Sequence, residues 1–383
     1  MEKLIYLDHG ATTRVDERVL NKMLPYFSVN YGNPSSAYFL GRRNKRVVEE
    51  ARQNVASCIG AKQKEIYFTS CGSESDNLAL KGIAYANSSK GKHIITSKIE
   101  HSAVLNTCAT LERQGFRVTY LNVNSNGMIN LEELENAITQ DTILISIMFA
   151  NNEIGTIEPI QKIGKIAKKH NVYFHTDAVQ AVGNISINVN ELGVDLLSMS
   201  AHKFYGPKGV GALYVREGVE FERIQDGGGQ EKGKRSGTEN VAGIVGLSTA
   251  IQYAYKEIDF NNTKLTALRN YFITSLQQRF ENIKINGDLD NRLPGNVNVS
   301  FKDIDGEQLL LKLDEYGICA SSASACCTGS SKTSHVLTAI GLDRKQASGT
   351  IRFTLGKENT KNEIDYVLNI LAKNIGFEKN WKV

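Results

Sequence analysis

The stretch Asp195-Leu196-Leu197-Ser198-Met199-Ser200-Ala201-His202-Lys203-Phe204-Tyr205-Gly206-Pro207-Lys208-Gly209 joins a short apolar run to a turn rich in glycine and proline. The apolar run predicts a buried strand, and the turn places Lys203 just beyond the end of that strand. A second apolar run, residues 210–215, follows at once. The stretch is therefore predicted to be a strand, a tight turn that carries a lysine, and another strand.

Outward from this stretch, apolar runs alternate with segments of helical period through the first two thirds of the chain. The runs that predict strands are residues 65–70, 93–97, 117–122, 142–149, 172–176, 195–200 and 210–215, and residues 160–170 show the helical pattern. This alternation predicts an α/β fold with a mainly parallel seven-stranded sheet, helices on both faces, and ligands at the carboxyl ends of the strands.

The pattern changes in the last third of the chain. Residues 221–238 are rich in glycine and charge, and we expect a long loop there. Helical segments at 241–256 and 265–282 follow, and then shorter candidate elements at 296–301, 308–315, 351–354 and 361–373. A chain of 383 residues exceeds one typical core. We predict a large domain over residues 13–260 and a smaller α+β domain formed by residues 1–12 and 261–383.

Composition and charge exclude several classes of function. The net charge of +4 comes from 45 basic and 41 acidic residues without long blocks of one sign, so no stripe for nucleic acid or anionic membranes is expected. No run approaches the roughly 20 apolar residues that span a bilayer, and the start lacks a leader pattern. Six cysteines without a C-x-x-C pair indicate free thiols. We expect a cytoplasmic protein.

Lys203 and Asp177 are the first pair of candidate catalytic residues. Asp177 lies in Phe174-His175-Thr176-Asp177-Ala178-Val179-Gln180, at the end of an earlier predicted strand. A lysine amine for a Schiff base and a carboxylate that keeps a pyridinium nitrogen protonated are what a pyridoxal 5′-phosphate enzyme requires. A solvated lysine and an aspartate that caps a helix are the plain alternatives. Gln180, three residues on, could reach the ring hydroxyl.

A phosphate site is predicted where the strand at 65–70 gives way to a helix. In Thr69-Ser70-Cys71-Gly72-Ser73-Glu74-Ser75-Asp76-Asn77, the N–H groups of Gly72 and Ser73 would point at one spot with the helix dipole behind them. A helix capped by Ser73, with Asp76 in its first turn, is the alternative. Ser200 and His202 flank Lys203 with a hydroxyl group and an imidazole.

Three further candidates follow predicted strands or lie in one. His101 could stack on a cofactor ring and relay protons, although a lone histidine is more often structural. Asn152, in Ala150-Asn151-Asn152-Glu153-Ile154-Gly155-Thr156, could hydrogen-bond a ring or a substrate. Arg352 offers a planar fork that matches a carboxylate, with a surface salt bridge as the alternative.

Small and hydroxylated residues surround Cys326. The stretch is Ala320-Ser321-Ser322-Ala323-Ser324-Ala325-Cys326-Cys327-Thr328-Gly329-Ser330-Ser331-Lys332-Thr333-Ser334-His335-Val336-Leu337. Such a loop has little to pack, which favours a reactive thiolate over the apolar surroundings of a structural cysteine. Composition alone leaves open a buried cysteine in a tight turn.

Taken in order, these segments resemble the NifS/IscS-type (group I) cysteine desulfurases, a class V branch of the fold type I, aminotransferase-like pyridoxal phosphate enzymes. The resemblance covers almost the whole chain. It also includes Tyr6-Leu7-Asp8-His9-Gly10-Ala11-Thr12-Thr13, Tyr31-Gly32-Asn33-Pro34-Ser35-Ser36 and Arg235-Ser236-Gly237-Thr238.

The resemblance implies a role for each matching residue. Those expected at the cofactor are Lys203 on its aldehyde carbon, Asp177 at the pyridine nitrogen, Gln180 at the ring oxygen, His101 stacked on the ring, and Gly72, Ser73, Ser200, His202 and, from the partner subunit of a homodimer, Thr238 at the phosphate. Those expected at the substrate are Asn33, Asn152 and Arg352. Cys326 is expected to be the nucleophile, and no metal is implied.

The implied reaction converts L-cysteine to L-alanine. Lys203 removes the α proton, Cys326 attacks the substrate sulfur, and His101 serves the thiols as acid and base. The persulfide is expected to pass to acceptor proteins for iron-sulfur clusters, thio-cofactors or tRNA thiolation. Cys71, Ala323, Cys327 and Thr333 depart from the family pattern, and Cys327 could compete for sulfur. Selenocysteine lyase, another class V activity, and a non-catalytic sulfur-transfer scaffold are the alternatives.

Overall fold

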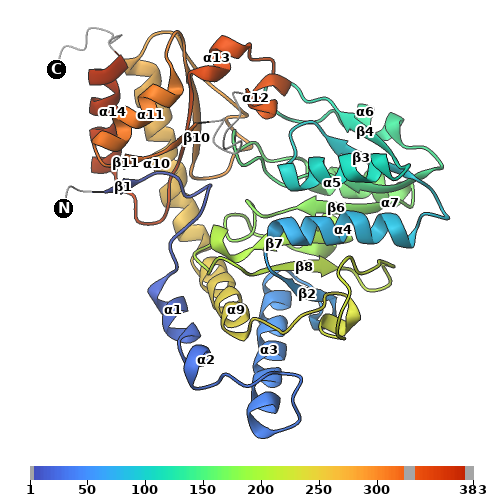
Figure 1. The fold of residues 1–383 in the computed structure, drawn as a ribbon. Coiled ribbons are helices and arrows are strands. Elements are labelled where there is room, and N and C mark those ends of the chain that lie inside the picture. Colours follow the sequence, from blue (N-terminus) through green and yellow to red (C-terminus); the bar gives the residue numbers. More distant parts are fainter. Residues whose placement is uncertain (1–3, 323–332, 376–383) are drawn as a thin grey trace.

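The computed structural model describes residues 4–322 and 333–375. Two sheets dominate this part of the chain, a large one at the centre and a smaller one near the two termini (Figure 1). The large sheet positions most of the candidate site residues, and the small sheet faces the edge at which they gather.

The large sheet has seven strands, and the prediction of a mainly parallel α/β sheet is confirmed. In spatial order the strands are β2 (Ile66–Thr69), β8 (Gly211–Val215), β7 (Leu196–Ser200), β6 (Tyr173–Asp177), β5 (Thr142–Ser146), β3 (His93–Ser97) and β4 (Arg117–Leu121). Among the strands described in this sheet, β8 alone runs opposite to the other six, and it pairs antiparallel with β2 and β7. The hairpin from β7 to β8 contains the Lys203 turn.

Apolar side chains of these strands alternate between the two faces of the sheet. On one face, residues such as Ile95, Ile145 and Leu197 pack with α3 (Phe39–Cys58), α7 (Ile160–Lys169) and α9 (Val241–Lys256). On the other, Ile94, Leu144 and Leu196 pack with α4 (Gly72–Ala86) and α5 (Ser102–Arg113). Because consecutive strand residues point to opposite faces, each face builds its own hydrophobic core.

The smaller sheet is antiparallel and has a separate core. Its strands, in spatial order, are β12 (Ser321–Ser322), β13 (Thr350–Thr354), β10 (Asn296–Phe301) and β9 (Ile283–Ile285), and beside it β1 (Ile5–Tyr6) pairs with β11 (Ile318–Cys319). Helices α10 (Ile258–Arg279), α11 (Gly306–Glu315) and α14 (Lys361–Ile375) complete the core, which also takes in Ile5 and Leu7. The start of the chain therefore packs with its last third, although the domain boundaries themselves stay a prediction.

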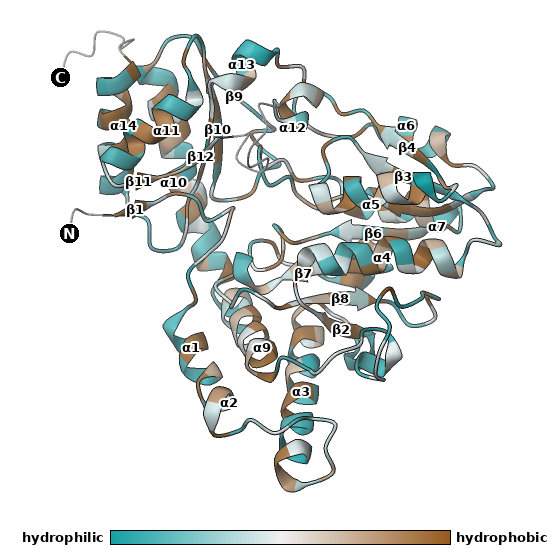
Figure 2. Ribbon diagram, in the orientation of Figure 1, coloured by the Kyte–Doolittle hydropathy of each residue, from teal (hydrophilic) through white to brown (hydrophobic). Residues whose placement is uncertain are grey.

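The remaining elements are short. They are the helices α1 (Glu17–Met23), α2 (Pro25–Ser28), α6 (Leu131–Ala137), α8 (Val189–Leu192), α12 (His335–Ala339) and α13 (Arg344–Ser348), with 3-10 turns at Gln63–Glu65, Ala201–Lys203 and Glu231–Gly233. Figure 2 shows α9 mostly brown and white and α4 alternating teal and brown, which matches a helix with one face exposed. No helix within residues 4–322 and 333–375 combines the length and the apolar character that a membrane span needs.

Two segments differ from the expectation. Helix α10 begins at Ile258, earlier than the predicted 265, and only Glu257 separates it from α9. The segment 221–238 holds the turn Glu231–Gly233, and Glu231 is buried in an ion pair with Arg52 at 2.6 Å. Glu231 can be buried because Arg52, which is distant in sequence, neutralises its charge. From the sequence alone it resembles a solvated loop residue.

Candidate active site

A cavity of about 350 Å³ lies at the carboxyl ends of the large sheet's strands. That volume falls within the range of small-molecule sites. Ten of the residues predicted for the site line it together, namely Gly72, Ser73, His101, Asn152, Asp177, Gln180, Ser200, His202, Lys203 and Arg352. The first nine follow or end strands and turns of the large sheet, and Arg352 comes from β13 of the small sheet.

Lys203 ends the 3-10 turn that follows β7. Its Nζ donates to the carbonyl oxygens of Gly10 and Ala11, at 2.5 and 2.7 Å. Two residues later Tyr205 has a φ of 64°, a left-handed conformation that costs energy for a residue with a side chain. The Tyr205 N–H donates to Thr13 Oγ1 at 2.8 Å, which holds the strained turn in place.

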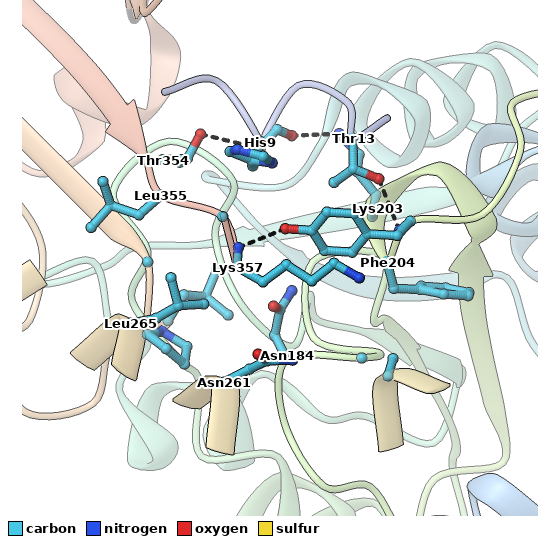
Figure 3. Close-up of a pocket in the computed structure, with 18 of the residues that line it drawn as sticks. His9, Thr13, Asn184, Lys203, Phe204, Asn261, Leu265, Thr354, Leu355 and Lys357 are labelled. Carbon is cyan, nitrogen blue, oxygen red and sulfur yellow. Dashed lines mark hydrogen bonds between the residues drawn. The ribbon is translucent and has the colours of Figure 1, made fainter. Parts of the chain in front are cut away.

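A neighbouring pocket borders the same turn on the side of the small sheet (Figure 3). There the Lys357 N–H donates to the Tyr205 hydroxyl oxygen at 2.8 Å, and Lys357 Nζ contacts Asp16 Oδ2 at 2.5 Å. The turn that carries Lys203 is thus fastened to the N-terminal segment and to the chain after β13.

Asp177 is a buried carboxylate at the end of β6, with a side chain that reaches the cavity. One oxygen, Oδ1, accepts the Val179 N–H at 2.9 Å. Burial raises the pKa of Asp177, and the nearby His101 and Lys203 act in the opposite direction. A cation at this position would restore the ionised form, because it compensates for the lost hydration.

A second buried carboxyl group, Asp76, lies close to Asp177. Oxygen atoms of both residues and a ring nitrogen of His101 lie within 4.8 Å of one another. Burial first, and then the charge of Asp177, raises the pKa of Asp76 well above its usual range. Two like charges at this depth repel, so we assign the ionised carboxylate to Asp177 and the proton to Asp76.

The imidazole of His175 lies behind these carboxyl groups and is fully buried. It is held by Ser146 Oγ at 2.9 Å and Ser198 Oγ at 3.0 Å, and its Nε2 lies 3.7 Å from Asp76 Oδ1. Burial lowers the pKa of His175 to about 3, so the ring is neutral. The negative charge of Asp177 is therefore not neutralised by this histidine.

The start of α4 forms a cup suited to an oxyanion. Gly72 and Ser73 are its first residues, and the preceding residue Cys71 makes no side-chain cap bond among the described contacts. A Cβ atom at position 72 would lie 2.6 Å from Val179 Cγ2, so only glycine fits. Ser200 Oγ is buried beside this cup and has no hydrogen-bond partner within the described residues. Unpaired donors at a helix N-terminus attract a phosphate.

His101 is both the cap of α5 and a wall of the cavity. Its Nδ1 accepts the Ala103 N–H at 3.1 Å, so the neutral ring carries its proton on Nε2. Burial lowers the pKa of His101, with Lys203 acting in the same direction and Asp177 against it. The ring is therefore a neutral imidazole at pH 7, able to lie against a flat group.

Arg352 is buried in β13 and carries the positive charge of the small sheet toward the cavity. Its Nη2 donates to Asp8 Oδ1 at 2.8 Å, and its Nη1 donates to the Asn152 carbonyl oxygen at 3.0 Å. Its Nε is buried and has no partner in the part of the chain that is described. An unsatisfied N–H on a cavity wall favours an anionic ligand.

Other predicted site residues lie elsewhere. Asn33 and Thr238 are exposed and do not line the cavity of their own chain as far as it is described. Cys326 and Cys327 lie outside the described residues. Just before them Ser321 lines the cavity, and just after them Ser334 donates to buried Glu153 at 2.6 Å.

Several groups that shape the cavity are not among the residues predicted for it. They are the carboxyl groups of Asp8 and Asp76, the ring of His175 and the carbonyl oxygens of Gly10 and Ala11. The sequence carries a signal for His175, which stands two residues before Asp177 on the same face of a strand. It carries none for the carbonyl groups, because every residue has one.

Comparisons with known proteins agree with this geometry. The model of the family "Aminotransferase class-V" matches residues 5–367. The chain is 54% identical over 375 residues to a protein of Clostridium botulinum named "Cysteine desulfurase IscS", which covers 97% of this chain and 94% of that protein. A relative of the same name in Methanosarcina thermophila is 54% identical over 371 residues, with 97% and 92% covered.

Solved structures show the same likeness. One titled "NIFS-LIKE PROTEIN" is 43% identical, covers 98% of this chain and all of its own, and has a TM-score of 0.92. Another, titled "SspA in complex with cysteine", is 39% identical, with 93% and 100% covered and a TM-score of 0.83.

Proposed function

The chain belongs to the class-V aminotransferase family, and within it to the NifS/IscS-type cysteine desulfurases, and we propose on that basis how its residues take sulfur from L-cysteine. The enzyme depends on pyridoxal 5′-phosphate. The proposal is carried by one observation: a lysine, a buried carboxylate, a helix-start cup and a buried arginine converge on a single cavity.

The residues present fit the cofactor. Gly72, Ser73 and the unpaired Ser200 hydroxyl would hold its phosphate, with His202 beside them. Asp177 would face its ring nitrogen. When bound, the cofactor supplies an electron sink for a carbanion at the substrate's α carbon.

The remaining cofactor contacts involve His101 and Gln180. The neutral ring of His101 would lie against the cofactor ring. Gln180 lines the cavity, and its Nε2 donates to the Gly10 carbonyl oxygen at 3.0 Å. The side-chain oxygen of Gln180 would then face away from Gly10, toward the ring hydroxyl group.

Lys203 would supply the amine that holds the cofactor and would also serve as the base. Its amine would remove the α proton of the bound substrate, since the residue is fixed at the end of its turn. His101, with its proton on Nε2, exchanges protons with the thiol groups of substrate and enzyme.

The substrate carboxylate would be held by Arg352 and the Asn152 side chain. Arg352 keeps N–H donors for this carboxylate, because the contacts to Asp8 and the Asn152 carbonyl oxygen engage only two of its five. Asn33 is kept as a predicted substrate contact, and because it is exposed on its own chain it would have to reach the site of a second subunit.

Cys326 would be the nucleophile. Its thiolate attacks the sulfur of the bound cysteine, so that the carbon–sulfur bond breaks, a sulfur–sulfur bond forms, and the electron pair returns to the carbon skeleton. Protonation of that skeleton gives L-alanine, and the enzyme keeps a persulfide. Delivery of this sulfur to acceptor proteins for iron-sulfur clusters, thio-cofactors or tRNA thiolation would complete the cycle.

A homodimer would complete the site. Large apolar side chains gather on α1, α2 and the segment before α3, and those more than half exposed are Leu24, Phe27, Val29, Tyr31, Tyr38 and Phe39. A patch of this kind is typical of a covered interface. Thr238, exposed on its own chain, would then reach the partner's phosphate cup. Sedimentation of the holoenzyme as a monomer would contradict this arrangement.

We also propose a cytoplasmic setting, in which cysteine thiols stay reduced. The described cysteines Cys58, Cys71, Cys108 and Cys319 form no disulfides with one another.

The experiment follows alanine and sulfur together. The enzyme is mixed with L-cysteine, alanine is quantified, and the intact protein is weighed for an added sulfur atom. Cys326→Ala should abolish both signals, and Cys327→Ala should retain them. Loss in Cys327→Ala alone would move the nucleophile to Cys327. Elimination of selenium from selenocysteine with no alanine from cysteine would favour a selenocysteine lyase instead.

A further inference from the structure

The N-terminal segment, residues 8–13, touches both the arginine and the lysine of the active site. It runs from β1 of the small-sheet region to α1. Asp8 Oδ1 accepts from Arg352 Nη2 at 2.8 Å, and Asp8 Oδ2 accepts from Ser321 Oγ at 3.2 Å. The carbonyl oxygens of Gly10 and Ala11 accept from Lys203 Nζ. One short segment therefore contacts both the proposed substrate-binding arginine and the proposed cofactor-binding lysine.

Arg352 is buried and Asp8 is largely shielded from water, with exposed side-chain fractions of 6% and 16%. At this depth a charge-assisted hydrogen bond is strong and directional, because water competes for it weakly. The contact to Asp8 fixes one nitrogen of the planar guanidinium group, and the Asn152 carbonyl oxygen fixes another. The plane of the group can then no longer rotate.

Two of the five N–H donors of the guanidinium group are then engaged, and the Nε–H and one N–H on each Nη remain. Nε has no partner among the residues described, and the side chain lines the cavity. The two contacts thus hold the guanidinium group in one orientation beside the cavity and leave donors for a carboxylate.

We propose that Asp8 is a positioning residue: its carboxylate orients the Arg352 guanidinium so that the N–H groups that Asp8 and Asn152 leave unused are kept for the carboxylate of the amino-acid substrate. The inference rests on the proposed function, since it takes Arg352 as the group that binds that carboxylate. Asp8 acts only through Arg352, so its loss should weaken substrate binding and leave the chemical step intact.

The contacts further along the segment explain why the chemical step should survive. The Gly10 N–H donates to Thr354 Oγ1 at 2.7 Å, and the Thr13 N–H donates to the His202 carbonyl oxygen at 2.9 Å. These bonds hold the Gly10 and Ala11 carbonyl groups independently of Asp8. The position of Lys203 should therefore be the same without the Asp8 charge.

The test compares Asp8→Asn with the wild-type holoenzyme. We expect KM for L-cysteine to rise about 10-fold or more, with kcat within about 3-fold, as for the loss of uniform binding. The Kd of L-alanine, followed by the change in cofactor absorption, should rise by the same factor. Asp303→Asn is the control, because Asp303 also pairs with a lysine beside the small sheet, Lys345, but does not contact Arg352 or line the cavity. Its KM and Kd should stay unchanged.

Two further variants separate the inference from the proposed function. Arg352→Ala should raise KM about 100-fold, and adding Asp8→Asn to it should change nothing more, because the residues act as a unit. An unchanged KM in Asp8→Asn would overturn the inference, whereas an unchanged KM in Arg352→Ala would contradict the proposed function. If Asp8→Asn fails to fold, Asp8→Ser removes the charge with a smaller side chain, and an unaltered KM there overturns the inference as well.

Discussion

The half of the cavity that the large sheet contributes differs from the half contributed by the small sheet and the N-terminal segment in how its polar groups are paired. On the large-sheet side, Asp177, Asp76 and Ser200 are buried, and the Ser200 Oγ and Asp76 Oδ1 atoms have no hydrogen-bond partner within the described residues. On the other side, Arg352 is already paired with Asp8. The first half is completed by a charged ligand, and the second is a prearranged ion pair whose guanidinium group keeps N–H donors for a ligand.

The two halves therefore bind the cofactor and the substrate through different kinds of interaction. Unsatisfied buried groups gain most from a ligand that stays, which suits a cofactor. A preoriented guanidinium group that keeps its own partner binds a carboxylate and releases it, which suits a substrate and its product. Damage to the first half should lower kcat or cofactor affinity, and damage to the second should raise KM.

The largest effect is expected for Asp177→Asn. The amide cannot stabilise a protonated ring nitrogen. The neighbouring His175 is neutral, so it cannot replace the lost negative charge. We expect kcat to fall by about 10²- to 10³-fold, the scale for removing a preorganised charge. Steady-state kinetics with saturating cofactor measure it. A variant with normal kcat would break the comparison on the cofactor side.

Gly72→Ala should act on cofactor affinity. The added Cβ meets Val179 Cγ2 at 2.6 Å, so the cup must open, and we expect the Kd of the cofactor to rise roughly 30-fold, by analogy with overpacking of a tight contact. Fluorescence titration of the apoenzyme measures it. Gly115→Ala is the control, since a Cβ there meets nothing within 4 Å, although its φ of 89° adds local strain. Equal cofactor Kd values in both variants would show that the start of α4 does not bind the phosphate.

Arg352→Lys tests the substrate side. Lysine keeps the charge but loses the planar fork, so it cannot bond Asp8, the Asn152 carbonyl oxygen and a substrate at once. KM for L-cysteine should rise about 10-fold while kcat and cofactor affinity stay near those of the wild type. A fall in cofactor affinity instead would show that the two halves are not separable.

One effect concerns stability and leaves the catalytic rate at a fixed pH unchanged, since Glu158 lies away from both halves of the cavity. Burial raises the pKa of Glu158 from 4.5 to about 8. Between these values the folded state holds a proton that the unfolded state has lost, so stability falls as pH rises through this window, by up to about 1.4 kcal/mol per pH unit. Denaturant unfolding of Glu158→Gln should show a weaker fall with pH than the wild type. If the free energy of unfolding depends on pH equally in both proteins, the proton is not bound by Glu158.

Much of the cofactor half could be predicted from the sequence. Its residues directly follow strongly apolar strands, as Lys203 follows β7 and Gly72 follows β2. A local sequence pattern is therefore enough to predict that they lie at the same edge of the sheet. Asp76 could not be predicted, because an aspartate in a first helical turn is typical of an exposed cap, and only the packing of α4 on the sheet buries it.

The substrate half was less predictable for a different reason. Arg352 was a candidate, but its partner Asp8 lies 344 positions away in the chain. No local pattern encodes that pairing, and the same holds for Glu231 with Arg52. Long-range ion pairs are set by the tertiary fold, which the sequence pattern specifies only as a class.

The most direct measurement of the central claim locates the cofactor on the chain. Holoenzyme is reduced with borohydride, digested, and its peptides are weighed. We expect the mass of reduced cofactor on the peptide that contains Lys203, and none in Lys203→Ala, which should also lose the visible absorption band and all alanine formation. Cofactor on another lysine, or a colourless protein that takes up none, would contradict it.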